Sequence, residues 1–434
     1  MISNWVTVRE HARLTTSSIS NTLDRAQISQ SAFDWLCQLQ SSFSGHGARL
    51  IEIENRCWLR LDNHVGVIQT PCGTSLEILP KHFDEHSCIE KSRELLCKLI
   101  RSALDLPTRE ASEASLALFT SPLTEWVMRQ FLLALDQLIK RGLRFEYQRI
   151  KEEQPFLRGQ IDMTKQMRQS PGRVHLFHQH HDLFLPDSPE NRLLKLALER
   201  VCQSTVEADN WRLSHELREI MQPISPSLQM QSDFAQWRNE RLMTHYQAIR
   251  PWCELILGEH MPLAIHGKWH GISLLFPMEK LFEQHVAKVF KRKLHSNAKL
   301  RSQVASHYLC NHNGHGIFQL KPDLLLQCKG QSWIFDTKWK RIHEKERSDK
   351  YGLNQGDFYQ MLAYGQQYLS GTGEMILIYP KTKDLTHPLK VFEYTQTLKL
   401  WVCPFDLEQD ELVTPSELKL PLQSLNPEIT ATMQ

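Results

Sequence analysis

Two aspartates and a lysine in the last third of the chain have the types and spacing that phosphodiester chemistry needs. The segment from Lys321 to Arg341 reads KPDLLLQCKGQSWIFDTKWKR. It predicts two short strands joined by a turn at Lys329-Gly330. Because side chains alternate across a strand, Asp336 and Lys338 project from the same face, near the end of the hairpin that also holds Asp323.

The register of this hairpin decides how close the acids come. With a two-residue turn, Cys328 faces Gln331, and counting back puts Asp323 directly opposite Asp336. A four-residue turn slides Asp323 toward Lys338 instead, so the three polar groups converge in either register. Neighbouring carboxylates repel and approach closely mainly when a cation lies between them. The pattern is typical of a metal-dependent phosphodiesterase. The alternative is an exposed hairpin end with an ordinary Asp–Lys ion pair, and the hairpin alone does not separate the two.

The elements around the hairpin are predicted from periodicity. Apolar residues at helical spacing predict a helix from Pro277 to Leu294, with Glu283 one position off the apolar stripe, where an acid can be half buried. A second helix is predicted for Gly356 to Leu369 and another strand for Glu374 to Tyr379. With a first strand near Gln303 to Leu309, the order is helix, three strands, helix, strand.

That order, with Pro322-Asp323 and Asp336-Thr337-Lys338, resembles the PD-(D/E)xK nuclease superfamily. Within it the chain resembles McrC, the nuclease subunit of McrBC-type modification-dependent restriction systems. A lone D…DxK pattern recurs by chance, whereas an ordered set of segments over most of the chain is specific. The segments that carry the resemblance are VGVIQTPCGTSLEILPKH (Val65–His82), RGQID (Arg158–Asp162), LFLPDSPENRLLKLAL (Leu183–Leu198), LFPMEKLFEQHVAKVF (Leu275–Phe290), KPD (Lys321–Asp323), FDTKWK (Phe335–Lys340) and DFYQMLAY (Asp357–Tyr364).

We therefore expect Mg²⁺-dependent hydrolysis of a DNA phosphodiester. Mg²⁺ prefers oxygen ligands and keeps several waters, so one or two carboxylates plus a substrate phosphate suffice. Asp323 and Asp336 are the expected metal ligands, and the superfamily resemblance implies the backbone carbonyl of Thr337 as a further one. Glu283 would add a carboxylate, directly or through water. Lys338 would orient or help deprotonate the attacking water and stabilise charge on the transition state.

Gln360 and Asp357, in the predicted second helix, are near the same expected site. Gln360 matches the Tyr-Gln found at that place in the family, so its carboxamide would fix the lysine, the water or a DNA phosphate; the alternative is a surface amide. Asp357 is interpreted as a helix-start residue rather than a ligand. Glu283 is preferred to Glu279, because LFE is the part that matches the family.

The expected fold class is α+β or mixed, in three parts. Residues 1–84 form an N-terminal β-rich module, 85–255 a mainly helical central region, and 256–434 the PD-(D/E)xK nuclease domain with an αβββαβ core. Residues 1 to about 45 are expected to be polar stretches around one helix, Ser31 to Leu39. Residues 387–403 alternate enough for two final strands.

Composition limits the other functions. The 434 residues carry a formal net charge of only +2, so any nucleic-acid contact must come from local patches. None of the ten cysteines forms a CxxC pair, which predicts reduced, buried thiols in a cytoplasmic protein. No apolar run approaches membrane-spanning length, and the N-terminus lacks a signal-peptide core. The histidines at 178, 180 and 181 do not have metal-ligand spacing and are interpreted as surface or core residues.

The chain contains no GxxxxGK[ST] or GxGxxG motif, so we expect it to bind no nucleotide itself. The resemblance implies a partner, McrB, a hexameric AAA+ GTPase that recognises double-stranded DNA carrying modified bases. It also implies that the N-terminal and central regions dock on that ring while the C-terminal domain cuts. Two alternatives remain at this point: a non-catalytic nuclease-fold adaptor that regulates an AAA+ NTPase or binds DNA, and a stand-alone nuclease.

Overall fold

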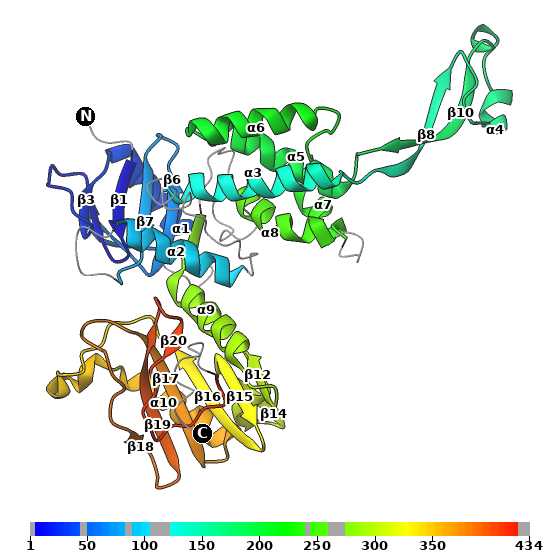
Figure 1. Cartoon of the computed structure of the whole chain (residues 1–434). Coiled ribbons are helices and arrows are strands. Elements are labelled where there is room, and N and C mark those ends of the chain that lie inside the picture. The colour runs from blue at the N-terminus through cyan, green and yellow to red at the C-terminus, as the bar shows by residue number, and fades with distance from the viewer. Residues whose placement is uncertain are drawn as a thin grey trace. The chain divides into compact units, whose positions relative to one another are not determined.

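A computed structural model describes residues 5–43, 50–82, 89–104, 122–238, 244–258 and 274–423. The chain forms two compact units, one of Met1–Phe119 with Leu275–Gln434 and one of Thr120–Leu274. Both units mix helices and sheets, which confirms the mixed α/β class (Figure 1). The predicted boundary after residue 84 lies outside the described residues, and the three-part division stays a prediction.

Residues 5–104, called here the N-terminal module, supply all four strands of the sheet β3-β2-β5-β4 and three strands of the sheet β1-β7-β6-β11. The fourth strand of that sheet, β11 (Leu274–Pro277), comes from later in the chain. The predicted helix from Ser31 to Leu39 is confirmed and lies within α1. The expectation of a polar stretch before it was wrong for residues 5–9, which form a strand. There, Val6 and Val8 alternate into the core and make β1 a parallel partner of β7. The module consists of β1 (Trp5–Arg9), β2 (Arg13–Thr15), β3 (Arg25–Gln27), α1 (Gln30–Phe43), β4 (Ile51–Asn55), β5 (Trp58–Leu61), β6 (His64–Gln69), β7 (Ser75–Leu79) and α2 (Ile89–Ala103).

The C-terminal region, residues 274–423, is built on a seven-stranded sheet with the order β12-β15-β16-β17-β19-β18 and β20 beside β19. Its first strand, β11, belongs instead to the module's sheet and runs directly into α9. The region consists of β11 (Leu274–Pro277), α9 (Met278–Lys293), β12 (Ala298–Ser302), β13 (His307–His312), β14 (His315–Leu320), β15 (Leu324–Cys328), β16 (Gln331–Thr337), a 3-10 helix (Arg347–Gly352), α10 (Gln355–Tyr368), β17 (Gly373–Pro380), β18 (Phe392–Glu393), β19 (Leu398–Asp406) and β20 (Glu411–Leu412).

The hairpin β15–β16 has the register of the two-residue turn. Cys328 pairs with Gln331, and the ladder runs without a shift to Leu324 opposite Phe335. Lys329 and Gly330 both have positive φ, 48° and 81°, as a tight hairpin turn of the primed type requires. Asp323 directly precedes Leu324 and Asp336 directly follows Phe335, so the two aspartates flank the last pair of this ladder.

A parallel crossover follows the hairpin. Strand β16 pairs in parallel with β17, which pairs in parallel with β19, and α10 makes the connection between the first two. The predicted second helix, the following strand and the two last strands are confirmed by α10, β17, β18 and β19. Gly365 lets α10 approach the sheet, since a Cβ there would lie 2.7 Å from Met375 Sδ.

The strand expected near Gln303 to Leu309 was wrong. The strand that pairs with β15 is β12, and it ends at Ser302 because Gln303 turns away with a φ of 51°. The alternating residues that follow belong to β13, which pairs with β14 in a separate hairpin. The observed order is therefore helix, strand, inserted hairpin, two strands, helix, strand.

The second unit combines helices with a three-stranded sheet, β8-β10-β9. Strands β8 and β10 pair over their whole length and form the long ribbon that extends from the helices in Figure 1. The prediction of a mainly helical region missed β8. The unit consists of α3 (Leu123–Arg141), β8 (Glu146–Gln154), β9 (Gln160–Ile161), α4 (Met163–Met167), a 3-10 helix (Pro171–Arg173), β10 (Phe177–Leu185), α5 (Pro189–Ser204), α6 (Ala208–Ile220), α7 (Met230–Gln236) and α8 (Thr244–Leu257).

Among the described residues, no helix has the length and apolar character to cross a membrane. The described cysteines are all free thiols, and Cys97 and Cys403 are buried as expected. Cys57, Cys72 and Cys310 are exposed, so the expectation of buried thiols was wrong for these positions.

Candidate active site

The two aspartates of the hairpin meet at the buried end of β16. Asp336 is 2% exposed and lies near the end of a parallel ladder, opposite Leu377 of β17. Asp323 precedes β15, and its Oδ2 accepts two hydrogen bonds from Thr337, one from the backbone N–H and one from the hydroxyl, both at 2.7 Å. Thr337 therefore fixes the Asp323 carboxylate beside the Asp336 carboxylate.

Lys338 lies between one of these acids and α10. Its Nζ is 2.7 Å from Asp336 Oδ2 and donates to Gln360 Oε1 at 3.1 Å. Gln360 Nε2 donates to the hydroxyl of Tyr364 at 2.8 Å, and that hydroxyl donates to the carbonyl of Lys321 at 3.0 Å. Gln360 is thus part-buried and held in place, which favours the interpretation that it fixes the lysine over a surface amide.

Asp357 belongs to this group although the sequence assigned it only to the start of a helix. It does lie in the first turn of α10, but it is buried, and its Oδ1 is 3.8 Å from Lys338 Nζ. Its Oδ2 is 3.4 Å from Lys340 Nζ. The spacing of an acid one turn before Gln360 on the same helix face was the signal that could have found it.

Glu283 approaches the acids from α9. It is half-buried, and Gln303 Nε2 donates to its Oε1. Burial raises the pKa of Glu283, and the nearby Asp323 charge raises it further. Gln303 was not predicted as a site residue; its place directly after β12, where its N–H donates to the Asp323 carbonyl at 2.9 Å, puts it there.

Burial and charge crowding dominate the electrostatics. Burial, with the Asp323 charge as the second cause, raises the pKa of Asp336 to about 7. Burial also raises the pKa of Asp323, although the Thr337 hydrogen bonds oppose this. For Lys338, burial lowers the pKa, but the Asp336, Asp357 and Asp323 carboxylates together outweigh it and the net shift is upward. The site therefore holds more negative charge than its own lysine neutralises.

The carboxylates of Asp323 and Asp336 are of the ligand type that a magnesium ion prefers. Across the described parts of the chain, no three His, Cys, Asp or Glu side chains are grouped so that they could cage a metal, the histidines of β10 included. Mg²⁺ needs only one or two carboxylates with waters and phosphate oxygens. Asp336 Oδ2 is buried, and the ammonium group of Lys338 lies 2.7 Å from it. Two adjacent carboxylates that share a single ammonium group fit a hard, oxygen-preferring cation.

A family model named McrBC 5-methylcytosine restriction system component matches residues 59–380. The chain belongs to this family. The match includes the β15–β16 hairpin and α10, so every candidate site residue of this McrBC family member lies inside it.

Two solved structures share the fold. A chain of the refined half-complex from the tetradecameric assembly of Thermococcus gammatolerans McrB AAA+ hexamers with bound McrC has a TM-score of 0.69 and 18% identity, over 93% of this chain and 94% of that chain. A chain of the cryo-EM structure of the Thermococcus gammatolerans McrBC complex has a TM-score of 0.50 and 19% identity, over 66% of this chain and 87% of that chain. No curated protein matches. At such identities the likeness to these structures establishes the fold alone.

The raised pKa of Asp336 predicts a specific pH dependence of stability. An acid whose pKa is higher in the folded state binds its proton more tightly when folded, so stability falls as the pH rises from the ordinary value of 3.8 toward about 7. In EDTA, Asp336→Asn removes this loss. Thermal unfolding at about pH 5 and about pH 8 should therefore show a smaller difference for Asp336→Asn than for the unsubstituted protein.

The matched control is Asp349→Asn, at an exposed aspartate of the same region. It should keep the pH dependence of the unsubstituted protein. An Asp336→Asn protein that loses as much stability between the two pH values as the control would contradict the assignment.

Proposed function

We propose that this McrBC family member is a Mg²⁺-dependent DNA endonuclease subunit of a modification-dependent restriction complex, with a PD-(D/E)xK active site. The observation that carries the proposal is the closeness of Asp323, directly before β15, to the end of β16 that holds Asp336, with Lys338 paired to Asp336 and bonded to Gln360. The order of α9, β12, β15, β16, α10 and β17 supports it, since this is the expected αβββαβ core with one inserted hairpin.

Asp323 and Asp336 would hold the metal, with the carbonyl of Thr337 as a further ligand and Glu283 acting directly or through water. A bound Mg²⁺ supplies positive charge that neutralises the scissile phosphate and lowers the pKa of a water ligand. It also offsets the repulsion that raises the pKa of Asp336, so both carboxylates would stay ionised at neutral pH.

Lys338 would act as a cation. Its pKa is raised by the surrounding acids, so at neutral pH it carries a proton and is a poor base. Its ammonium group would instead orient the attacking water and stabilise the negative charge that grows on the phosphate oxygens. Gln360 would keep the ammonium group in place, because its own amide is anchored on Tyr364.

Substituting the acid at the centre of the site tests this chemistry. Asp336→Ala should abolish cleavage of methylated plasmid DNA, with a loss of at least about a hundredfold, because it removes a metal ligand and the partner of Lys338. The assay contains Mg²⁺, nucleotide and the AAA+ partner, and nicked and linear products are resolved on a gel.

Asp349→Ala, at an exposed acid of the same region, serves as the control and should cut at the full rate. Undiminished cleavage by Asp336→Ala would remove the proposed active site. An unsubstituted protein that binds the partner but never cuts would favour the non-catalytic adaptor. Cutting without any partner would favour a stand-alone nuclease.

We further propose that the chain works in the cytoplasm with a McrB-like AAA+ GTPase hexamer, which would recognise modified bases in double-stranded DNA. The two Thermococcus gammatolerans structures contain McrB together with McrC, and the present sequence has no nucleotide-binding motif of its own. Both observations support a division in which the ring hydrolyses GTP and this chain cuts.

The ribbon of β8 and β10 is a candidate contact with that ring. Tyr147 and Phe184 are cross-strand partners, and Phe184 stacks on Phe145 with ring centroids 5.1 Å apart. These three rings are 76%, 56% and 43% exposed, respectively. Contiguous exposed aromatic surface of this kind is typical of a protein interface. Further exposed apolar residues of the ribbon and its end are Phe156, Leu157, Met163, Met167 and Val174.

A double substitution of this cross-strand pair tests the docking. Tyr147→Ser with Phe184→Ser should weaken binding to the GTPase ring by about tenfold or more, because aromatic anchors dominate interface energies. Binding is measured by biolayer interferometry, and the stimulated rate of GTP hydrolysis should fall in parallel at subsaturating protein.

Trp211→Ser is the matched control, since Trp211 is a 53% exposed aromatic on α6 of the same unit. An equal loss in this control, or wild-type binding by the double variant, would rule out the ribbon as a specific contact.

A further inference from the structure

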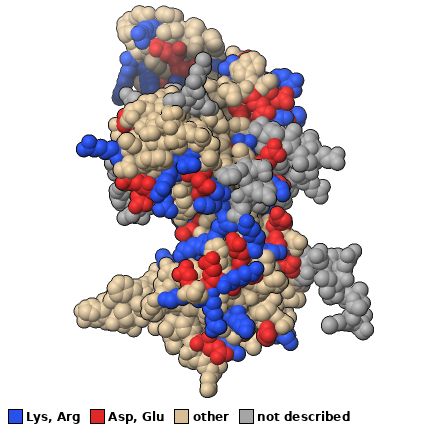
Figure 2. All heavy atoms as spheres, turned by 90° about the vertical axis from the view of Figure 1, so that its left-hand side faces the viewer, with Lys and Arg blue, Asp and Glu red and all other residues tan. Residues whose placement is uncertain are grey.

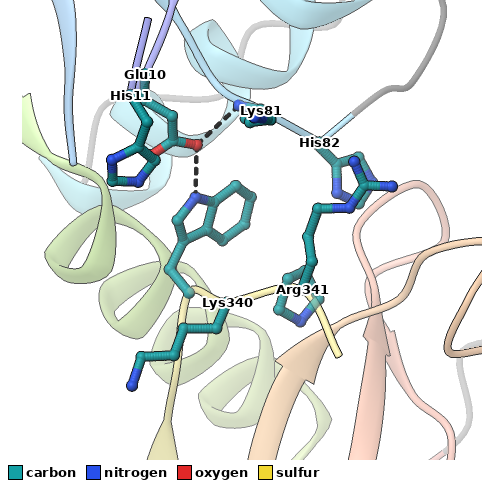
Figure 3. A pocket seen from close by; sticks show the side chains of 8 residues that line it. Glu10, His11, Lys81, His82, Lys340 and Arg341 are labelled. Carbon is teal, nitrogen blue, oxygen red and sulfur yellow. Dashed lines mark hydrogen bonds between the residues drawn. The ribbon is translucent and has the colours of Figure 1, made fainter. Parts of the chain in front are cut away.

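A pocket of about 290 Å³ opens beside the chain segment that carries Lys338 (Figure 3). Glu10, His11, Lys81 and His82 line it from the N-terminal module, and residues 339–341 line it from the C-terminal region. Both sets of residues belong to the same compact unit. Of these residues only Lys340 contacts the candidate active site, through Asp357, so the pocket is a neighbouring feature that lies directly after the segment carrying Lys338.

Glu10 builds the wall of the pocket and does not leave an acceptor open to it. Its Oε1 accepts the Lys81 backbone N–H at 2.7 Å and the Trp339 indole N–H at 2.8 Å, and these are the dashed lines of Figure 3. Its Oε2 is fully buried, and the whole residue is 1% exposed. Burial raises the pKa of Glu10, so its negative charge in this wall is disfavoured.

Trp339 is held as a rigid wall by the same contacts. Besides its bond to Glu10, its ring packs against Phe282 of α9, with centroids 5.3 Å apart, and lies 6.1 Å from the ring of His82. An indole fixed at its N–H and on one side presents an apolar surface to the pocket, of the kind on which a sugar or base packs.

The remaining polar groups of the pocket are three cationic side chains and the imidazoles of His11 and His82. Lys81, Lys340 and Arg341 supply cations, and in Figure 3 the Arg341 guanidinium extends toward His82. The cations are partly exposed, and each lies 3.4 to 3.8 Å from an aspartate, which is buried in the case of Asp357. The pairs are Lys81 Nζ to Asp24 Oδ1 at 3.8 Å, Lys340 Nζ to Asp357 Oδ2 at 3.4 Å and Arg341 Nη2 to Asp384 Oδ2 at 3.6 Å.

We propose that this pocket binds a backbone phosphate of the DNA strand next to the scissile position, with Lys81, Lys340 and Arg341 as its cationic contacts and Trp339 as the wall against the sugar. The proposal rests on the proposed nuclease function and deepens it. The N-terminal module then completes the substrate site, rather than serving only as a scaffold or as a contact for the partner.

Chemistry and position favour this ligand. Three cationic donors beside a flat apolar wall suit a phosphodiester, because phosphate oxygens accept hydrogen bonds from Lys and Arg. Lys340 follows Lys338 by two residues, about 7 Å of extended chain. That distance is about two base steps along a strand of duplex DNA. The charged groups on one face are mixed in sign, so such a local site, and not a general positive field, must hold the strand (Figure 2).

The test measures DNA binding without cutting. The full chain carrying Asp336→Ala is titrated with a short fluorescent duplex in EDTA over a range of KCl concentrations, followed by fluorescence anisotropy. Adding Lys81→Ala or Arg341→Ala should weaken binding about threefold to tenfold and lower the slope of log affinity against log salt by about one, because one phosphate contact is lost. Lys81→Arg should retain both values.

The matched control is Lys419→Ala, since Lys419 lines a different pocket of about 300 Å³ in the same region. It should bind DNA as the parent does, and thermal unfolding should show that all variants are folded. Wild-type affinity and slope in both Lys81→Ala and Arg341→Ala would overturn the proposal, as would a parent protein without salt-dependent DNA binding.

A second arm separates DNA from a free anion. Inorganic phosphate is titrated as competitor and as ligand in the same proteins. If the substitutions weaken binding of inorganic phosphate but not of DNA, the pocket is a free-anion site and the proposal is wrong. The outcome is independent of the chemistry at Asp336: continued cutting by Asp336→Ala in Mg²⁺ would end the proposed active site, while the binding series in EDTA still decides the pocket.

Discussion

Repulsion between two carboxylates is the constraint around which the C-terminal region is arranged. Asp323 and Asp336 are neighbours across β15 and β16, and Asp336 is almost fully buried. Isolated charges in such a place are costly, and they persist only when hydrogen bonds, an ion pair or a cation offset the cost. Thr337 supplies the hydrogen bonds, and Lys338 supplies one positive charge. The remaining excess of negative charge is what makes the site suited to a divalent cation.

The N-terminal module and the C-terminal region share structural elements rather than a loose linker. Strand β11 completes a sheet of the module and continues directly into α9, and Met278 N–H donates to the Asn63 carbonyl. Buried His285 of α9 contacts Ser102 of α2 at 2.8 Å and Asp410 at 2.9 Å. Glu10 reaches Trp339, the residue after Lys338. A change in the module would therefore reach the segment that carries Lys338 through short, fixed contacts.

The sequence predicted those elements of the C-terminal region whose form depends on residues close together in the chain. The turn at Lys329-Gly330 allowed two registers, both of which bring Asp323 close to Asp336 and Lys338, and the structure has the two-residue turn with its two positive φ angles. The stripe of Met278, Phe282 and Val286 predicted α9. Strand β12 could not be placed, because alternation at 307–309 is equally strong and only tertiary pairing decides which run joins β15. Contacts such as that of Glu10 with Trp339 join residues far apart in the chain, and the periodicity of the sequence does not predict them.

The central claim, that these two carboxylates form a divalent-cation site, is tested most directly by isothermal titration of Mg²⁺ into the full chain and into Asp336→Asn at about pH 8. The account predicts saturable binding to the unsubstituted protein, with a rise in its unfolding temperature, and loss of both in Asp336→Asn. Equal Mg²⁺ affinity and an equal rise in unfolding temperature in the two proteins would contradict it.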